Sequence, residues 1–176
     1  MPDGLSQARL SGSLSDGDLA ASPGYPSVAR LARGPCAVIE CVEAIPCNPC
    51  EPACPHGAIL VGQPITNPPI LDEDKCIGCG LCLAACPGLA IFLVDLRRAD
   101  GMAAVSVPYE YLPLPRRGQT VLAVTRDGVA CCTAMVERVL NPKRNDRTAV
   151  VTVVVPREMA NQVRGIILPE EAGHDA

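Results

Sequence analysis

Two runs of cysteine that match each other with an offset of 32 residues constrain this chain more than any other feature of its sequence. The first run, "CNPCEPACP", begins at Cys47, and the second, "CIGCGLCLAACP", begins at Cys76. A shift of 32 residues overlays three pairs of cysteines: Cys47 on Cys79, Cys50 on Cys82, and Cys54 on Cys86. Short apolar segments, "AILV" and "AIFLV", follow the two runs in the same register. The repeat predicts two copies of one loop–helix–strand unit.

The second run has the spacing Cys76-x2-Cys79-x2-Cys82-x3-Cys86-Pro, which is typical of thiolates that hold [4Fe–4S] clusters. In this pattern three cysteines bind one cluster and the fourth binds a neighbouring cluster. The two glycines between these cysteines let the backbone approach the sulfides, where amide N–H groups donate hydrogen bonds. Tetrahedral zinc is the alternative, because two CxxC pairs also suit it. The repeated run with its terminal Cys-Pro favours iron and sulfur.

The first run departs from the repeat at one position. Where the repeat predicts a fourth cysteine the chain has Ala44, and the nearest upstream thiol is Cys41. In one interpretation the intervening residues loop out and Cys41 completes a [4Fe–4S] cluster; in the other the centre is [3Fe–4S]. We favour the first, because a cluster that lacks one thiolate is more labile and a candidate thiol is close by. The predicted ligands are therefore Cys41, Cys47, Cys50 and Cys86 for cluster 1, and Cys76, Cys79, Cys82 and Cys54 for cluster 2.

The composition excludes several classes of protein. There is no Trp, one Phe and three Tyr against 18 Pro and 15 Gly, so we expect cofactors and partner subunits to contribute much of the stability. A net charge of −4 without a basic stripe argues against a nucleic-acid interface. No apolar run reaches the length of about 18 residues that a membrane span needs. The N-terminus does not resemble a signal peptide, which predicts a cytoplasmic protein whose cysteines bind metal rather than form disulfides.

The chain divides into three predicted parts. Residues 1–34, rich in Gly, Ser, Pro and Asp, form an N-terminal arm that is either disordered or wrapped around a partner. Residues 35–98 hold nine of the eleven cysteines and form the two-cluster domain. Residues 103–168 form a small β module and C-terminal tail, with "QTVLAVT" and "TAVVTVVVP" as strands and Asp127-Gly128 as a hairpin turn. The segment "REMANQVRGIIL" forms a short helix or a final strand.

We assign minor roles to the three cysteines outside the two ligand sets and to His56. Cys36 is structural or spare, and Cys131-Cys132 are interpreted as small buried hydrophobes, with a redox pair as the alternative. His56 is either a turn residue or a donor to a cluster sulfur. The chain has no Ser/His/Asp set, no HExxH and no phosphate loop, so we predict no catalytic residue.

Residues 41–94 resemble the two-cluster bacterial ferredoxins. Over a longer stretch, "PGYPSVARLARGPCAVIECVEAIPCNPCEPACPHGAI", "CIGCGLCLAACPGLAIFLVD" and "VPYEYLPLPRRGQ" are similar to small iron–sulfur subunits of dye-linked proline, hydroxyproline and opine-type amino-acid dehydrogenases. The resemblance implies an α+β fold: a ferredoxin-like two-cluster core with a pseudo-twofold repeat, then an all-β module, preceded by an extended arm. It also implies a hetero-oligomer in which this chain relays electrons between FAD- or FMN-containing subunits.

Three alternatives remain open at this stage. The chain could be a free-standing ferredoxin, but the added β module and arm argue for a subunit. It could be a zinc-held interaction protein, which would be colourless. It could also be an iron–sulfur enzyme with an open iron site where Ala44 stands, although no acid, base or substrate clamp accompanies that position.

Overall fold

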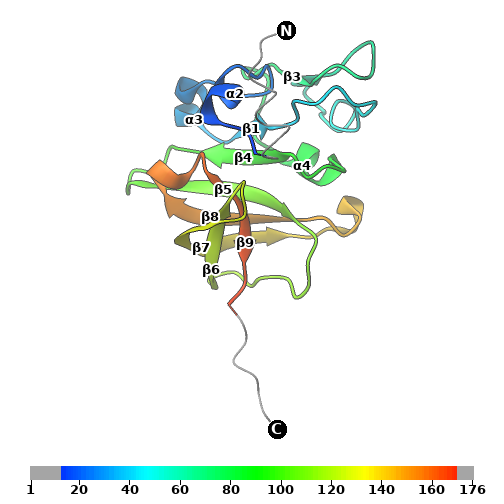
Figure 1. Ribbon diagram of the computed structural model, residues 1–176. Coiled ribbons are helices and arrows are strands. Elements are labelled where there is room, and N and C mark those ends of the chain that lie inside the picture. The colour runs from blue at the N-terminus through cyan, green and yellow to red at the C-terminus, as the bar shows by residue number, and fades with distance from the viewer. Residues whose placement is uncertain (1–12, 170–176) are drawn as a thin grey trace.

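The computed structural model describes residues 13–169 and is mostly β-sheet (Figure 1). One antiparallel sheet has the strand order β1-β4-β5-β8-β7-β6-β9. These strands are β1 (Cys36–Ile39), β4 (Ile91–Asp95), β5 (Met102–Tyr109), β6 (Thr120–Thr125), β7 (Ala130–Leu140), β8 (Ala149–Pro156) and β9 (Val163–Ile167). A second sheet pairs β2 (Ile59–Leu60) with β3 (Ile70–Leu71). The helices are short: α2 (Asp16–Ala20), α3 (Val28–Arg33), α4 (Leu81–Ala85), and the 3-10 turns η1 (Lys143–Asn145) and η2 (Arg157–Met159).

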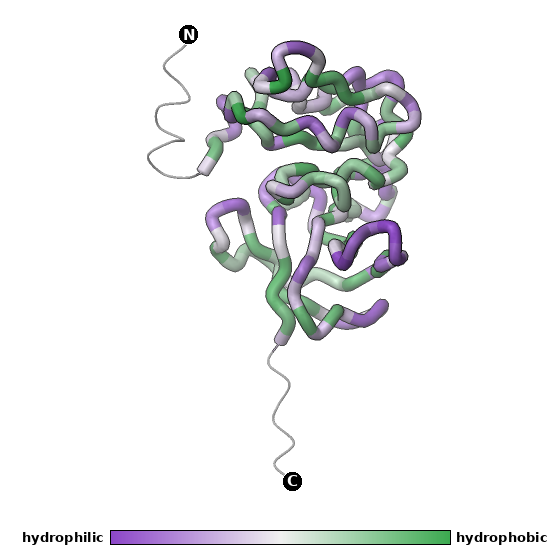
Figure 2. Tube along the Cα trace, turned by 90° about the vertical axis from the view of Figure 1, so that its right-hand side faces the viewer, coloured by the Kyte–Doolittle hydropathy of each residue, from purple (hydrophilic) through white to green (hydrophobic). Residues whose placement is uncertain are grey.

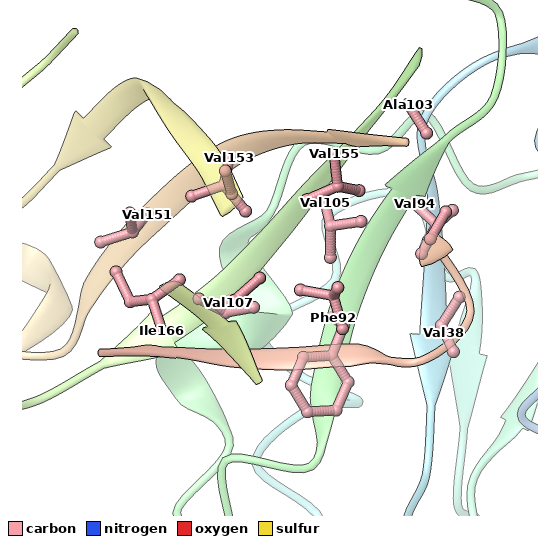
Figure 3. Close-up of a cluster of buried hydrophobic side chains, with 14 of the residues drawn as sticks. Val38, Phe92, Val94, Ala103, Val105, Val107, Val151, Val153, Val155 and Ile166 are labelled. Carbon is pink, nitrogen blue, oxygen red and sulfur yellow. The ribbon is translucent and has the colours of Figure 1, made fainter. Parts of the chain in front are cut away.

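The core on the inner face of the large sheet consists mainly of valine. Side chains alternate between faces along a strand, so Val105 and Val107 of β5 and Val151 and Val153 of β8 point to the same side (Figure 3). Phe92, the only phenylalanine, lies at the edge of this group. Figure 2 shows hydrophobic stretches along the strands and hydrophilic stretches in the loops. Closely packed β-branched side chains therefore form a continuous core despite the scarcity of aromatic residues.

The Asp127-Gly128 hairpin predicted from the sequence is present between β6 and β7. The Thr125 carbonyl accepts a hydrogen bond from the N–H of Gly128 at 2.9 Å, and the Thr125 N–H donates to the Val129 carbonyl at 2.9 Å. Gly128 has φ 75°, the left-handed conformation that closes such a turn at little cost only for glycine. The segment "REMANQVRGIIL" forms both of the elements considered for it, the η2 turn and strand β9.

The large sheet runs across the boundary that the sequence suggests between residues 98 and 103. β1 and β4, which lie within the cysteine-rich half, pair with each other, and β4 also pairs with β5. β1 leads directly into Cys41, and β4 follows Cys86. The loops that carry the cysteines are thus attached to one end of the same sheet that forms the β module (Figure 1).

The described part of the N-terminal segment differs from the extended arm that its composition suggests. Ser15 and Ser27 cap the short helices α2 and α3, which bury Leu19 and Leu31. The Gly24 carbonyl accepts a hydrogen bond from the N–H of Ile39 at 3.0 Å, so the segment packs against the cysteine-rich half. Residues 1–12 lie outside the described structure. Within residues 13–169, no helix has both the length and the apolar character needed to cross a membrane.

The two copies of the repeat are not equally regular. The second copy contains helix α4, whereas the first has only turns between Cys50 and Cys54. One of these turns is closed by a hydrogen bond from the Ala53 N–H to the Pro49 carbonyl at 3.2 Å. Proline at 52 removes a backbone donor from this segment, which disfavours a longer helix. The strands that follow also differ in length, because β2 spans two residues and β4 spans five.

Candidate metal centre

The four predicted ligands of cluster 2 line one small cavity. Cys76, Cys79 and Cys82 come from the second run, and Cys54 crosses over from the first. Burial raises the pKa of Cys82 to about 12, and the neighbouring sulfurs of Cys76, Cys79 and Cys54 contribute to this rise. Metal coordination removes the proton from such a thiol outright. The chain therefore brings together four sulfur donors, and binding to a metal centre would convert them to thiolates.

The four predicted ligands of cluster 1 form a second group. Cys41, Cys47 and Cys86 line an open hollow of about 630 Å³. Cys50 is buried beside them: burial raises its pKa to about 11, with contributions from Cys86, Cys41 and Cys47 in that order. Each group thus contains one cysteine from the other run, as the exchange pattern of the repeat predicts.

The residues between Cys41 and Cys47 form an exposed loop at the rim of this hollow, where Val42, Glu43 and Ile45 line it beside the cysteines. Ala44, Ile45 and Pro46 are exposed, and the segment is drawn into a tight turn by hydrogen bonds from the Ile45 N–H to the Glu43 carbonyl and from the Cys47 N–H to the Ile45 carbonyl. Cys41 remains next to the end of β1, where Glu40 donates its N–H to the Ala90 carbonyl at 2.9 Å. The looped-out insertion therefore leaves Cys41 near Cys47 and Cys86 in place of the residue at 44.

Three groups donate hydrogen bonds to the sulfur of Cys76. The N–H groups of Ala37, at 3.4 Å, and of Gly78 donate to its sulfur, as does the thiol of Cys36. These bonds, with that of Cys36 the strongest, lower the pKa of Cys76 to about 5, while the same contact raises the pKa of Cys36. Sulfur ligands of iron–sulfur clusters are held and tuned by such donors. Sequence reasoning missed this role of Cys36, because strand β1 and the Cys76 loop are far apart in the chain.

The loop between Cys76 and Cys79 packs closely against Pro35, and this contact requires glycine at position 78. Gly78 has φ 70°, and an added Cβ would lie 2.5 Å from the Pro35 carbonyl oxygen. Arg30, a buried side chain, donates to that same carbonyl at 3.2 Å and to the Glu73 carbonyl at 2.7 Å. Because Arg30 holds Pro35 in place, the neighbouring backbone has little freedom to move away.

A buried ionic triad stands immediately before Cys41. Glu40 Oε1 accepts hydrogen bonds from Arg164 Nε at 2.6 Å and from Arg126 Nη2 at 3.0 Å. The guanidinium of Arg164 also lies 4.9 Å from the centre of the Phe92 ring, within range of a cation–π interaction. The triad ties β9 and the β6–β7 turn to the metal-binding half. No local sequence signal predicts it, because its members are 86 and 124 residues from Glu40.

The other candidate side chains lie apart from the two cysteine groups or at their rim. All eleven cysteines are free thiols. Cys131 and Cys132 pack against the valine core, and Cys131 donates to the Ala123 carbonyl at 3.3 Å. His56 is exposed at the rim of the cavity that the predicted ligands of cluster 2 line. Among residues 13–169, no three His, Cys, Asp or Glu side chains are arranged to hold a single metal ion.

The donor set fits iron–sulfur clusters. Two groups of four cysteines would supply the thiolates, and backbone N–H groups donate to Cys76 and, from Ala58 at 3.3 Å, to Cys54. Comparison with protein families agrees, because a model described as a 4Fe-4S binding domain matches residues 69–92. The chain therefore contains a 4Fe–4S ferredoxin-type binding domain.

Three curated relatives are each similar to a limited stretch of the chain. One subunit of an ion-translocating oxidoreductase complex of Methanosarcina acetivorans is 44% identical over 52 residues, which is 30% of this chain and 19% of that protein. A polyferredoxin-like subunit of an aliphatic sulfonate oxidoreductase of Pyrococcus furiosus is 46% identical over 48 residues, 27% of each chain. An uncharacterised ferredoxin of Methanocaldococcus jannaschii is 47% identical over 45 residues, 26% of this chain and 28% of that protein. The chain thus spans less than a third of the length of these relatives, and no solved structure matches it.

Proposed function

We propose that this chain, which contains a 4Fe–4S binding domain, is a non-catalytic electron-transfer subunit of a cytoplasmic flavoprotein dehydrogenase complex that oxidises an amino acid or a related amine. The observation that carries the proposal is the pair of four-cysteine groups, each with one thiol from the opposite run. Two relatives bear the names of oxidoreductase-complex subunits, which supports an electron-transfer role within an assembly. The amine substrate and the flavin partners rest on the resemblance to small dehydrogenase subunits.

In this proposal each residue of the site has a defined task. Clusters would supply one-electron transfer, and the two groups of cysteines would hold two of them as neighbours, with Cys54 and Cys86 as the exchanged ligands. The N–H groups of Ala37 and Ala58 would stabilise negative charge on the sulfurs of Cys76 and Cys54. The looped segment before Cys47 would let Cys41 serve as the fourth ligand of cluster 1.

Exposed aliphatic side chains near both cysteine groups support a subunit role. Ile77, next to the ligand Cys76, is 58% exposed, and Ile45, in the loop before Cys47, is 47% exposed. In the β module, the adjacent residues Tyr111 and Leu112 are 74% and 86% exposed. An adjacent exposed pair such as Tyr111 and Leu112 is a candidate for a surface that a partner covers. A partner docked over Ile45 or Ile77 would approach a cluster closely.

Iron counting after anaerobic purification tests the cofactor assignment. We expect a brown protein with about eight irons per chain for two cubanes; about seven would indicate a three-iron centre, and about four an empty first site. Zinc in place of iron would contradict the proposal.

Replacing Cys41 by Ser tests the ligand that the repeat alone does not supply. We expect the EPR signal of cluster 1 to change to that of a three-iron centre or to disappear, with a matching loss of iron, because the thiolate is removed. Cys131→Ser, at a half-buried cysteine remote from both groups, is the control and should leave iron and EPR unchanged. A Cys41→Ser protein with the native EPR spectrum would remove Cys41 from the ligand set.

Co-purification tests the subunit assignment. When the tagged chain is isolated anaerobically from its native cells, we expect a flavin-containing subunit in fixed stoichiometry, together with dye-linked oxidation of an amino acid. A monomer that exchanges electrons with many unrelated reductases would instead indicate a free-standing ferredoxin.

A further inference from the structure

A hollow of about 660 Å³ lies on the outer face of the large sheet, opposite the valine core. Its floor is lined by small side chains on two paired strands, Ala104 and Ser106 of β5 and Thr152 of β8, where Ser106 faces Thr152 in the register. The larger Leu93 and Val139 stand on either side. Small residues between larger ones create the depth, and the volume lies within the range of about 300–1,000 Å³ typical of small-molecule sites.

The charges around the hollow do not balance. Asp95 pairs with Arg97, with Arg97 Nη2 at 2.7 Å from Asp95 Oδ2, and Glu137 pairs at 2.9 Å with Arg98, which also pairs with Asp100 at 3.1 Å. Two further arginines, Arg117 and Arg138, also line the hollow. The side chain of neither has a hydrogen-bond or ion-pair partner within residues 13–169. The hollow therefore carries two guanidinium groups that are available to an anion.

The floor offers a buried hydrogen-bond donor. Ser106 Oγ and Thr152 Oγ1 lie 2.8 Å apart, and each residue is only 4% exposed. One hydroxyl donates to the other, so the accepting hydroxyl keeps its own proton. No other partner for either hydroxyl occurs in the part of the chain that the structure describes. Because a buried donor without an acceptor is costly, this proton favours a ligand oxygen placed on the floor.

We propose that the hollow binds a compact organic dianion, such as a phosphate monoester or a dicarboxylate. The guanidinium groups of Arg117 and Arg138 take its charged oxygens, since the planar fork of arginine matches both carboxylate and phosphate. The hydroxyl pair donates to an oxygen on the floor, and the uncharged body of the ligand lies against Leu93 and Val139. Gly78 lines the same hollow, so the ligand contacts the loop between Cys76 and Cys79.

Direct binding to the full-length, anaerobically purified chain tests this site. Inorganic phosphate, flavin mononucleotide and succinate are titrated by calorimetry, with riboflavin as the uncharged counterpart. We expect saturable binding of at least one dianion at one site per chain and none of riboflavin. The double change Arg117→Gln and Arg138→Gln should weaken that binding at least tenfold. Arg144→Gln, an exposed arginine in η1 outside the hollow, is the matched control and should leave it unchanged.

A second variant tests the shape of the site separately from its charge. Ala104→Leu places a larger side chain on the floor and should abolish binding while both arginines remain, with circular dichroism to verify the fold. The same titrations on the purified complex identify the source of the anion. Binding by the isolated chain indicates a free metabolite, and binding only in the complex indicates the anionic end of a cofactor held by a partner subunit.

Three results would overturn the proposal. These are no saturable binding of any dianion to the chain or to the complex, equal weakening by Arg144→Gln, and undiminished binding in the Arg117/Arg138 double variant. The readout does not involve iron, so the site stands or falls independently of the cluster assignment.

Discussion

Replacing Glu40 by glutamine is expected to lower the free energy of unfolding by about 3–5 kcal/mol, among the largest effects of any single substitution in this chain. Glu40 is the only carboxylate in contact with Arg164 and the closest one to Arg126 among the described residues, and its side chain is 8% exposed. Glutamine keeps the size and an acceptor oxygen but removes the negative charge. Two buried guanidinium groups would then lose the counter-ion that they share, and Arg126 would keep only the exposed Asp16 at 3.9 Å, which disfavours the folded state.

Urea denaturation of the anaerobic protein, followed by circular dichroism, measures this effect. Glu137→Gln is the matched control: its ion pair with Arg98 is 41% and 34% exposed, so its loss should cost at most about 1 kcal/mol. Adding Arg164→Met to the Glu40→Gln protein should restore part of the stability, since one uncompensated charge is then replaced by an apolar side chain. Equal midpoints for the native and Glu40→Gln proteins would show that the triad contributes little.

If the chain holds the two proposed clusters, replacing Gly78 by alanine is expected to remove cluster 2 and with it about half of the iron. The new Cβ would lie 2.5 Å from the Pro35 oxygen and 2.6 Å from the Pro35 Cβ, at a residue whose φ of 70° already disfavours any side chain. Arg30 holds the Pro35 carbonyl, so relief of the clash must move the loop that carries Cys76 and Cys79. Iron analysis and low-temperature EPR measure the loss.

The variant Gly80→Ala distinguishes the steric clash with Pro35 from the conformational cost of placing a side chain at a positive φ. Gly80 also has a positive φ, 82°, but its added Cβ would meet only Leu93 Cδ1 at 3.5 Å, an ordinary van der Waals distance. We therefore expect this variant to lose about 1–2 kcal/mol of stability and to keep its iron. If both variants retain full iron, the contact with Pro35 does not constrain the metal site.

Local patterns account for much of this fold. The apolar run ending at Pro156 predicted β8, and the Asp-Gly pair predicted the β6–β7 hairpin, because strand alternation and turn chemistry act over a few residues. The 32-residue repeat predicted which thiols would gather, and the structure places Cys54 with the second run and Cys86 with the first. The assignment of these residues as ligands remains a prediction for the iron and EPR measurements.

Contacts between distant segments escaped the sequence reasoning. Nothing near Cys36 shows that its thiol reaches Cys76, and nothing near Glu40 shows that Arg126 and Arg164 converge on it. The low aromatic content predicted that cofactors and partner subunits contribute much of the stability, and it did not indicate that valines at alternate positions of β5 and β8 pack into a continuous core. Each of these features depends on strand order, which the spacing of cysteines does not encode.

The pairing of β4 with both β1 and β5 also determines which fragments of this chain can fold on their own. A fragment severed after residue 98 would leave β4 as a bare edge with unpaired N–H and C=O groups and would uncover the face on which Phe92 and Val94 lie. Such edges invite aggregation. We therefore expect the metal-binding half to be unstable when it is expressed alone, and a fragment that folds must include strands β5 to β9.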